Sequence, residues 1–81
     1  MASILIVDDD EDIRELLKYN LERHNHTVRA VENGLKCLEA VASEKPDLIL
    51  LDVMMPEMDG IEVCEQLKAN EAYNSILICF L

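Results

Sequence analysis

The sequence predicts an α/β domain built on a parallel sheet, because short apolar runs alternate with stretches of helical periodicity. Residues 4–7 and 48–51 are unbroken apolar runs, the pattern of strands that are buried on both faces. Each of these runs ends in aspartate, at the edge where open α/β sheets bind ligands. The predicted order is βαβαβαβ with right-handed crossovers.

Local signals place each element along the chain. Acidic residues suit the first turn of the first helix, and Asp10 or Glu11 lies near its N-cap. Asn33-Gly34 ends the second strand, and Lys45-Pro46 ends the second helix. Strands are predicted at residues 3–7, 27–31, 48–51 and 76–81, helices around the apolar positions 13–21, 35–42 and 61–67, and a loop at 54–60.

Composition limits the class of protein. The 81 residues suffice for one small domain, and the net charge of −10 argues against nonspecific binding to nucleic acid or anionic lipid. The longest apolar run, residues 76–81, is far shorter than the roughly 20 residues that span a bilayer. The three cysteines show no CxxC spacing and are expected as small buried hydrophobes. These features predict a cytoplasmic domain without membrane contact.

Three aspartates carry the candidate chemistry. If the strands that precede them are neighbours, Asp8, Asp9 and Asp52 meet at one sheet edge, where their charges repel. Mg²⁺ is the cation that fits, and a backbone carbonyl after Asp52 would complete its shell. A carboxylate beside that ion is a nucleophile for a phosphoryl group. The alternatives are a solvated, helix-capping acidic face at residues 8–12 and a plain strand terminator at Asp52.

Three segments together resemble the receiver domain of two-component response regulators, and the resemblance runs in register over essentially the whole chain. They are residues 4–17 (ILIVDDDEDIRELL), 30–34 (AVENG) and 46–60 (PDLILLDVMMPEMDG). The resemblance implies a flavodoxin-like parallel sheet with four strands in the order 2-1-3-4 and three helices. It also implies a phosphoacceptor that promotes its own phosphoryl transfer rather than a dedicated enzyme.

The resemblance assigns site residues one by one. Asp52 matches the phosphoacceptor, which takes a phosphoryl group from a histidine kinase or phosphotransfer protein. Asp8 and Asp9 match the acidic pair that holds Mg²⁺, or Mn²⁺ in its place, with Asp9 as a direct ligand and Asp8 acting through water. Met54 matches the position whose backbone carbonyl completes the metal shell. The loop that shapes the site is matched by Pro56 and Gly60.

The chain departs from the family beyond its fourth strand. Receivers continue with a Ser or Thr, helix 4, a fifth strand that ends in Lys, and helix 5, whereas this sequence stops at Leu81. Residues 1–81 are therefore expected to be a single partial receiver domain. The alternative function is a fragment that folds or self-assembles but cannot switch. Self-association is expected through the exposed edge at 76–81 or through uncovered apolar faces.

The remaining motifs give weaker evidence about function. An EF-hand at Asp8-x-Asp10-x-Asp12 fails, because Ile13 stands where that loop needs glycine. His24 and His26 are expected in a solvated turn, and Glu57 and Asp59 as solvated loop charges. The methionines at 54, 55 and 58 form either a partner surface or loop packing near the site.

Overall fold

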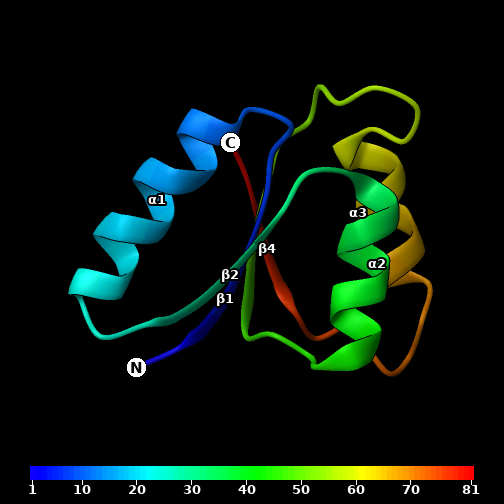
Figure 1. The fold of residues 1–81 in the computed structure, drawn as a ribbon. Coiled ribbons are helices and arrows are strands. Elements are labelled where there is room, and N and C mark those ends of the chain that lie inside the picture. Colours follow the sequence, from blue (N-terminus) through cyan, green and yellow to red (C-terminus); the bar gives the residue numbers. More distant parts are fainter.

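The computed structural model describes all 81 residues and confirms the predicted element order (Figure 1). The strands form one parallel sheet in the order β2-β1-β3-β4, as the resemblance implies. The elements are β1 (Ser3–Val7), α1 (Glu11–Arg23), β2 (Thr27–Val31), α2 (Gly34–Ser43), β3 (Leu48–Leu51), α3 (Gly60–Lys68) and β4 (Leu77–Phe80).

The sheet separates two unequal apolar layers. Side chains alternate along each strand, so Leu5 and Val7 face one side while Ile4 and Ile6 face the other. The first side carries the larger core, which α2 and α3 cover, and the second is covered by α1 alone (Figure 1). The larger core contains Leu5, Val7, Cys37, Val41, Ile49, Leu51, Met55, Val63, Leu67 and Ile76.

The prediction that residues 48–51 are buried on both faces is wrong for half of them. Ile49 and Leu51 are fully buried in the larger core, but Leu48 and Leu50 are only half-buried. Their side faces α1, which has no buried residue and leaves Leu16 60% exposed. One helix cannot cover a four-stranded sheet, so this face stays partly open to water.

All three helices begin on side-chain caps, and the caps of α2 and α3 refine the predicted boundaries. The Asn33 side chain accepts from the Lys36 amide at 2.8 Å and starts α2 at Gly34. The Asp59 side chain accepts from the Glu62 amide at 2.9 Å and starts α3. Asp59 is exposed, as predicted, and its side chain is in addition the N-cap of α3. Asp10 caps α1 in the same way, as predicted.

Strand β4 is shorter than the predicted run of residues 76–81. Ile76 lies just before it and is buried in the larger core, whereas Leu81 follows it and still donates its amide to the Leu51 carbonyl at 2.9 Å. Leu77 is 69% exposed and Phe80 is 43% exposed. The outer edge of the sheet is therefore an exposed apolar strand, as the sequence predicts.

The cysteines differ in environment. Cys37 is fully buried, and burial raises the pKa of its thiol from 9.0 to about 12, which keeps it unreactive. Cys64 is half-buried and Cys79 is exposed, so the expectation of three buried thiols is wrong for Cys79. None of the three helices has the length and apolar character needed to cross a bilayer.

Candidate acidic functional site

Strand register brings the first two aspartates together. Val7 and Leu51 are the last paired residues of β1 and β3, so Asp8 and Asp52 are the next positions on adjacent strands. The ladder continues one step beyond the strands, because the Asp52 amide donates to the Val7 carbonyl at 2.9 Å. On the other side, the Asp8 amide donates to the Val31 carbonyl at 3.2 Å. Both aspartates are thus held by the sheet itself rather than by a free loop.

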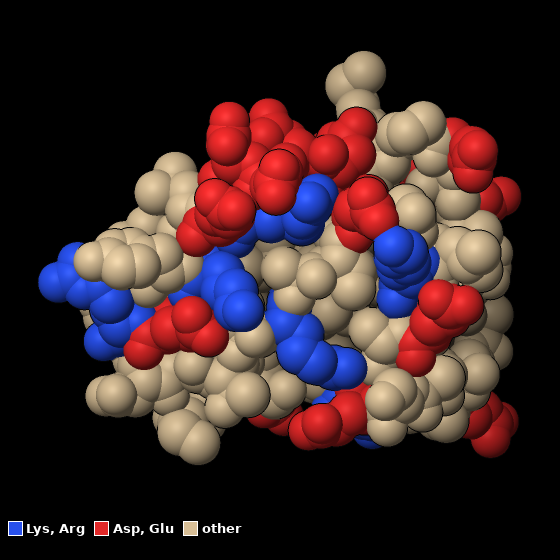
Figure 2. All heavy atoms as spheres, viewed as in Figure 1, with Lys and Arg blue, Asp and Glu red and all other residues tan.

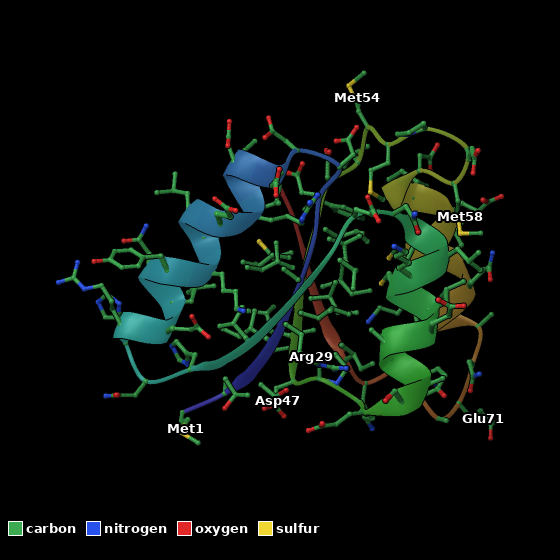
Figure 3. The ribbon with its side chains drawn as sticks, viewed as in Figure 1. Met1, Arg29, Asp47, Met54, Met58 and Glu71 are labelled. Atoms are coloured by element: carbon green, nitrogen blue, oxygen red, sulfur yellow. The ribbon has the colours of Figure 1, made fainter.

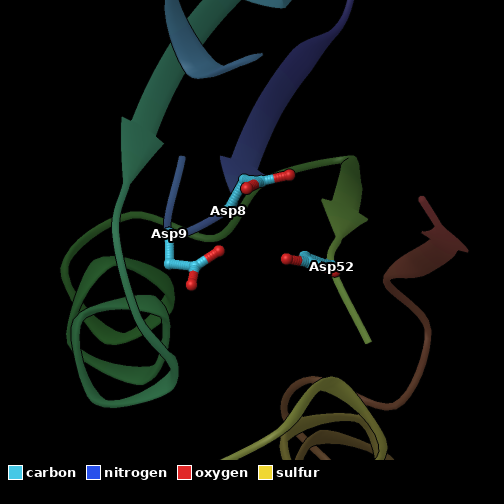
Figure 4. Close-up of side chains that lie close together, drawn as sticks. All are labelled: Asp8, Asp9 and Asp52. Carbon is cyan, nitrogen blue, oxygen red and sulfur yellow. The ribbon is translucent and has the colours of Figure 1, made fainter. Parts of the chain in front are cut away.

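The three predicted aspartates form one cluster (Figure 4). One carboxylate oxygen from each of Asp8, Asp9 and Asp52 lies within 4.8 Å of the others. Asp8 is buried, with 4% of its surface exposed, while Asp52 is half-buried and Asp9 is exposed. The site therefore has a buried floor and an open side that faces solvent.

The electrostatics of the cluster favour a cation. Burial raises the pKa of Asp8, and the negative charges of Asp52, Asp9 and Asp10 raise it further, although a hydrogen bond from the Asp10 amide to Asp8 Oδ1 opposes them. Figure 2 shows acidic side chains gathered at the end of the molecule where the loops leave β1 and β3. Three carboxylate oxygens at this spacing are a hard donor set, which fits Mg²⁺.

Met54 is anchored to the cluster by its backbone. Its amide donates to Asp52 Oδ1 at 3.1 Å, whereas its side chain is 84% exposed and points away from the molecule (Figure 3). Met55 is buried and Met58 packs against the larger core, so these two methionines serve loop packing. The Met54 backbone thus stays beside Asp52 whatever its side chain does.

The loop between β3 and α3 closes tightly around Asp52. The Met58 amide donates to the Pro56 carbonyl at 2.8 Å across Glu57, whose φ of 67° lies in the left-handed region. At the end of the loop, the Gly60 amide donates to the Val53 carbonyl at 3.0 Å. A Cβ on Gly60 would lie 2.4 Å from the Asp52 carbonyl oxygen, so only glycine permits this approach.

Two contacts near the site were missed from the sequence. Asp59 caps α3, and its Asp-x-x-Glu spacing to Glu62 is a recognised N-terminal signal. Arg14, one turn into α1, donates from Nη1 to the Asp8 carbonyl oxygen at 2.7 Å. No local pattern announces the second contact, because it joins a helix side chain to the end of a strand.

The fold and the site define a class of protein: a parallel α/β domain that carries clustered carboxylates at the carboxyl ends of adjacent strands. The chain belongs to the response regulator receiver domain family, whose model matches residues 4–80. Its sheet and helices are those of the flavodoxin-like receiver domains that it resembles in structure.

Curated relatives support the same family. The chain is 51% identical over 75 residues to the alkaline phosphatase synthesis transcriptional regulatory protein PhoP of Bacillus subtilis. The matched segment covers 93% of this chain and 31% of PhoP. It is 48% identical over 66 residues to the response regulator MprA of Mycobacterium ulcerans, covering 82% of this chain and 28% of MprA. The chain thus spans less than a third of the length of these relatives.

Solved structures agree in fold. The N-terminal domain of a response regulator receiver protein from Methanoculleus marisnigri superposes with a TM-score of 0.96 at 38% identity, over 99% of this chain and 65% of that one. The signal receiver domain of a histidine kinase from Syntrophus aciditrophicus superposes with a TM-score of 0.95 at 37% identity. The match covers 100% of this chain and 61% of that one.

Proposed function

We propose that this receiver domain accepts a phosphoryl group on Asp52 from a histidine kinase or phosphotransfer protein, with a divalent cation bound beside it. The observation that carries the proposal is the cluster of Asp8, Asp9 and Asp52, whose carboxylate oxygens approach within 4.8 Å in a chain of the receiver family. Mg²⁺ is the proposed cofactor and Mn²⁺ the alternative, held by the three carboxylates and the Met54 backbone carbonyl.

The transfer needs one free nucleophilic oxygen. The Met54 amide holds Asp52 Oδ1, which leaves Oδ2 to attack phosphorus. The bond from phosphorus to the donor imidazole nitrogen breaks as the new phosphorus–oxygen bond forms, and that nitrogen keeps the electron pair. A bound cation would offset charge on the phosphoryl oxygens. The product is an aspartyl phosphate, so the domain is a phosphoacceptor rather than a dedicated enzyme.

The remaining assignments follow from that role. Residues 1–81 are proposed to be one structural unit of a receiver domain, since all four strands belong to a single sheet. Pro56 and Gly60 are proposed to shape the loop around the phosphoacceptor. A cytoplasmic location suits the phosphodonors proposed here. The alternative function, a unit that folds but cannot be phosphorylated, is an outcome of the experiment below.

The test is the intact mass of the protein after incubation with acetyl phosphate. With Mg²⁺ present we expect one added phosphoryl group, and with excess chelator none. Mg²⁺ alone should raise the melting temperature, because a ligand at about 100 times its Kd adds about 2.7 kcal/mol to the free energy of unfolding. A folded sample that binds Mg²⁺ but never gains mass would refute phosphoryl transfer and leave only the metal site.

We also propose that this chain self-associates through the outer edge of β4. That edge carries no charged residue, and Leu77, Phe80 and Leu81 are each more than 40% exposed. An unpaired apolar edge is a template for another strand. Light scattering should therefore show a mass that rises with concentration, and Leu77→Lys should shift it towards the monomer. A monomer mass throughout the micromolar to millimolar range contradicts the proposal.

A further inference from the structure

The turn that joins β1 to α1 carries two of the three clustered aspartates, and one side chain from α1 holds it. Arg14 Nη1 donates to the main-chain carbonyl oxygen of Asp8 at 2.7 Å. Arg14 is half-buried, and its own amide donates to the Asp10 carbonyl at 3.1 Å. The residue is thus fixed at both ends, by the first turn of the helix and by the end of the strand.

With this contact, nearly every polar group of Asp8 has a partner. Its amide donates to the Val31 carbonyl, its Oδ1 accepts from the Asp10 amide at 2.9 Å, and its carbonyl accepts from Arg14. Only Oδ2 has no protein donor. The Asp8 backbone is thus held on both sides and its carboxylate at one oxygen, which leaves Oδ2 oriented for a ligand, as supporting hydrogen bonds do at metal sites.

Arg14 could influence the acidic site either through its positive charge or through its hydrogen bond to the Asp8 backbone. A cation beside a cluster of carboxylates competes electrostatically with a bound metal ion. Arg14 forms no ion pair with the cluster, since its side-chain hydrogen bond is to a neutral carbonyl oxygen. The hydrogen bond and charge of Lys36 lower the pKa of Glu32, and the positive charge of Arg14 lowers it only slightly further. The contact with Asp8 is therefore one of geometry more than of charge.

We propose that Arg14 is a positioning residue of the acidic site, which fixes the Asp8 carbonyl so that Asp8 and Asp9 present their carboxylates towards Asp52. The inference deepens the proposed function and rests on it. Removing the Arg14 side chain has two effects on Mg²⁺ affinity, and they have opposite signs. Loss of a nearby positive charge alone would tighten Mg²⁺ binding, whereas loss of positioning would weaken it.

The first experiment measures the Mg²⁺ Kd by calorimetry, below the melting temperature of each variant. Arg14→Met keeps the length of the stem and removes the donors, and Lys18→Met is the matched control, one turn further along α1 and exposed. We expect Arg14→Met to weaken binding about 10-fold, the lower end of the range for supporting residues at metal sites. Lys18→Met should leave the Kd unchanged or slightly lower.

If Arg14→Met does not fold, the Mg²⁺ Kd of Arg14→Lys tests the proposal instead. A single flexible ammonium donor in place of the planar guanidinium should weaken Mg²⁺ binding by an intermediate factor while the charge is unchanged. Equal or tighter binding in either folded Arg14 variant overturns the inference. Equal weakening in Arg14→Met and Lys18→Met overturns it too, because the effect would then be a general one of charge or stability.

A second readout needs no metal. The Asp10 amide is protected by its hydrogen bond to Asp8 Oδ1, so release of the turn should speed its hydrogen exchange. We expect at least 10-fold faster exchange at Asp10 in Arg14→Met and no change in Lys18→Met. Unchanged exchange overturns the inference. If the parent protein binds no Mg²⁺, the proposed function fails, while this readout still decides whether Arg14 positions the turn.

Discussion

Replacing Asp52 by asparagine should abolish phosphorylation completely and raise the melting temperature of the metal-free domain. An amide is not a nucleophile for phosphorus, so no adduct should form with acetyl phosphate and Mg²⁺. Stability should rise because one of three clustered negative charges is removed. The repulsion relieved is on the order of 1 kcal/mol, which corresponds to about 4–8 °C for a domain of this size.

The stabilisation should depend on pH in a defined direction. Asp8 has a raised pKa in the folded protein, partly because of the charge on Asp52, so the folded state binds the Asp8 proton more tightly than the unfolded state. The stability that this proton confers is present below the ordinary pKa of 3.8 and is lost as pH rises through the raised pKa. The increase in the free energy of unfolding caused by Asp52→Asn should therefore be full at neutral pH and should shrink in acid.

Thermal melts of matched variants check this prediction. Glu71→Gln removes one negative charge at the opposite end of the molecule and should leave the melting temperature nearly unchanged (Figure 3). Mg²⁺ should stabilise the parent and Glu71→Gln equally, and Asp52→Asn much less. A lower melting temperature for metal-free Asp52→Asn than for the parent would show that crowding of the carboxylates is not a source of instability.

Gly60→Ala should be among the most damaging substitutions outside the core. The added Cβ would lie 2.4 Å from the Asp52 carbonyl oxygen and 2.9 Å from Val53 Cα. Both neighbours are backbone atoms just after β3. The steric clash can therefore be relieved only by moving the backbone of Asp52, the proposed phosphoacceptor. We expect the free energy of unfolding to fall by about 1–3 kcal/mol and Mg²⁺ binding to weaken in the folded fraction.

Gly34→Ala is the control, because it places a Cβ in a space that is almost as tight. Its nearest neighbours are Val63 Cγ2 at 2.8 Å and the Met58 side chain at 3.0 Å. These neighbours are side-chain atoms, and the flexible Met58 side chain in particular can shift without moving the backbone that carries the site. Urea denaturation should therefore show a smaller loss for Gly34→Ala, with unchanged Mg²⁺ affinity. The reverse order would contradict the view that backbone contact at Gly60 is the tighter constraint.

Much of the fold and the heart of the candidate site could be predicted from the sequence. Three of the four strands have their predicted bounds, because short β-type runs with polar ends are local signals, unbroken and apolar in β1 and β3 and weaker in β2. The meeting of Asp8 and Asp52 followed from topology, since parallel neighbours end at the same edge of a sheet. The role of Asp52 as phosphoacceptor is a prediction that phosphorylation of the parent and of Asp52→Asn tests, and the roles of Met54 and Pro56 likewise remain predictions.

Other features were decided only by tertiary packing. The half-buried state of Leu48 and Leu50 depends on how much of one sheet face α1 covers, which no apolar run can reveal. The contacts of Arg14 with Asp8 and of Gly60 with Asp52 join elements through distances set by helix docking. Local sequence determines which element each residue joins, because propensity and periodicity act over a few residues. Contacts between elements depend on the whole packed arrangement, and only the folded structure supplies it.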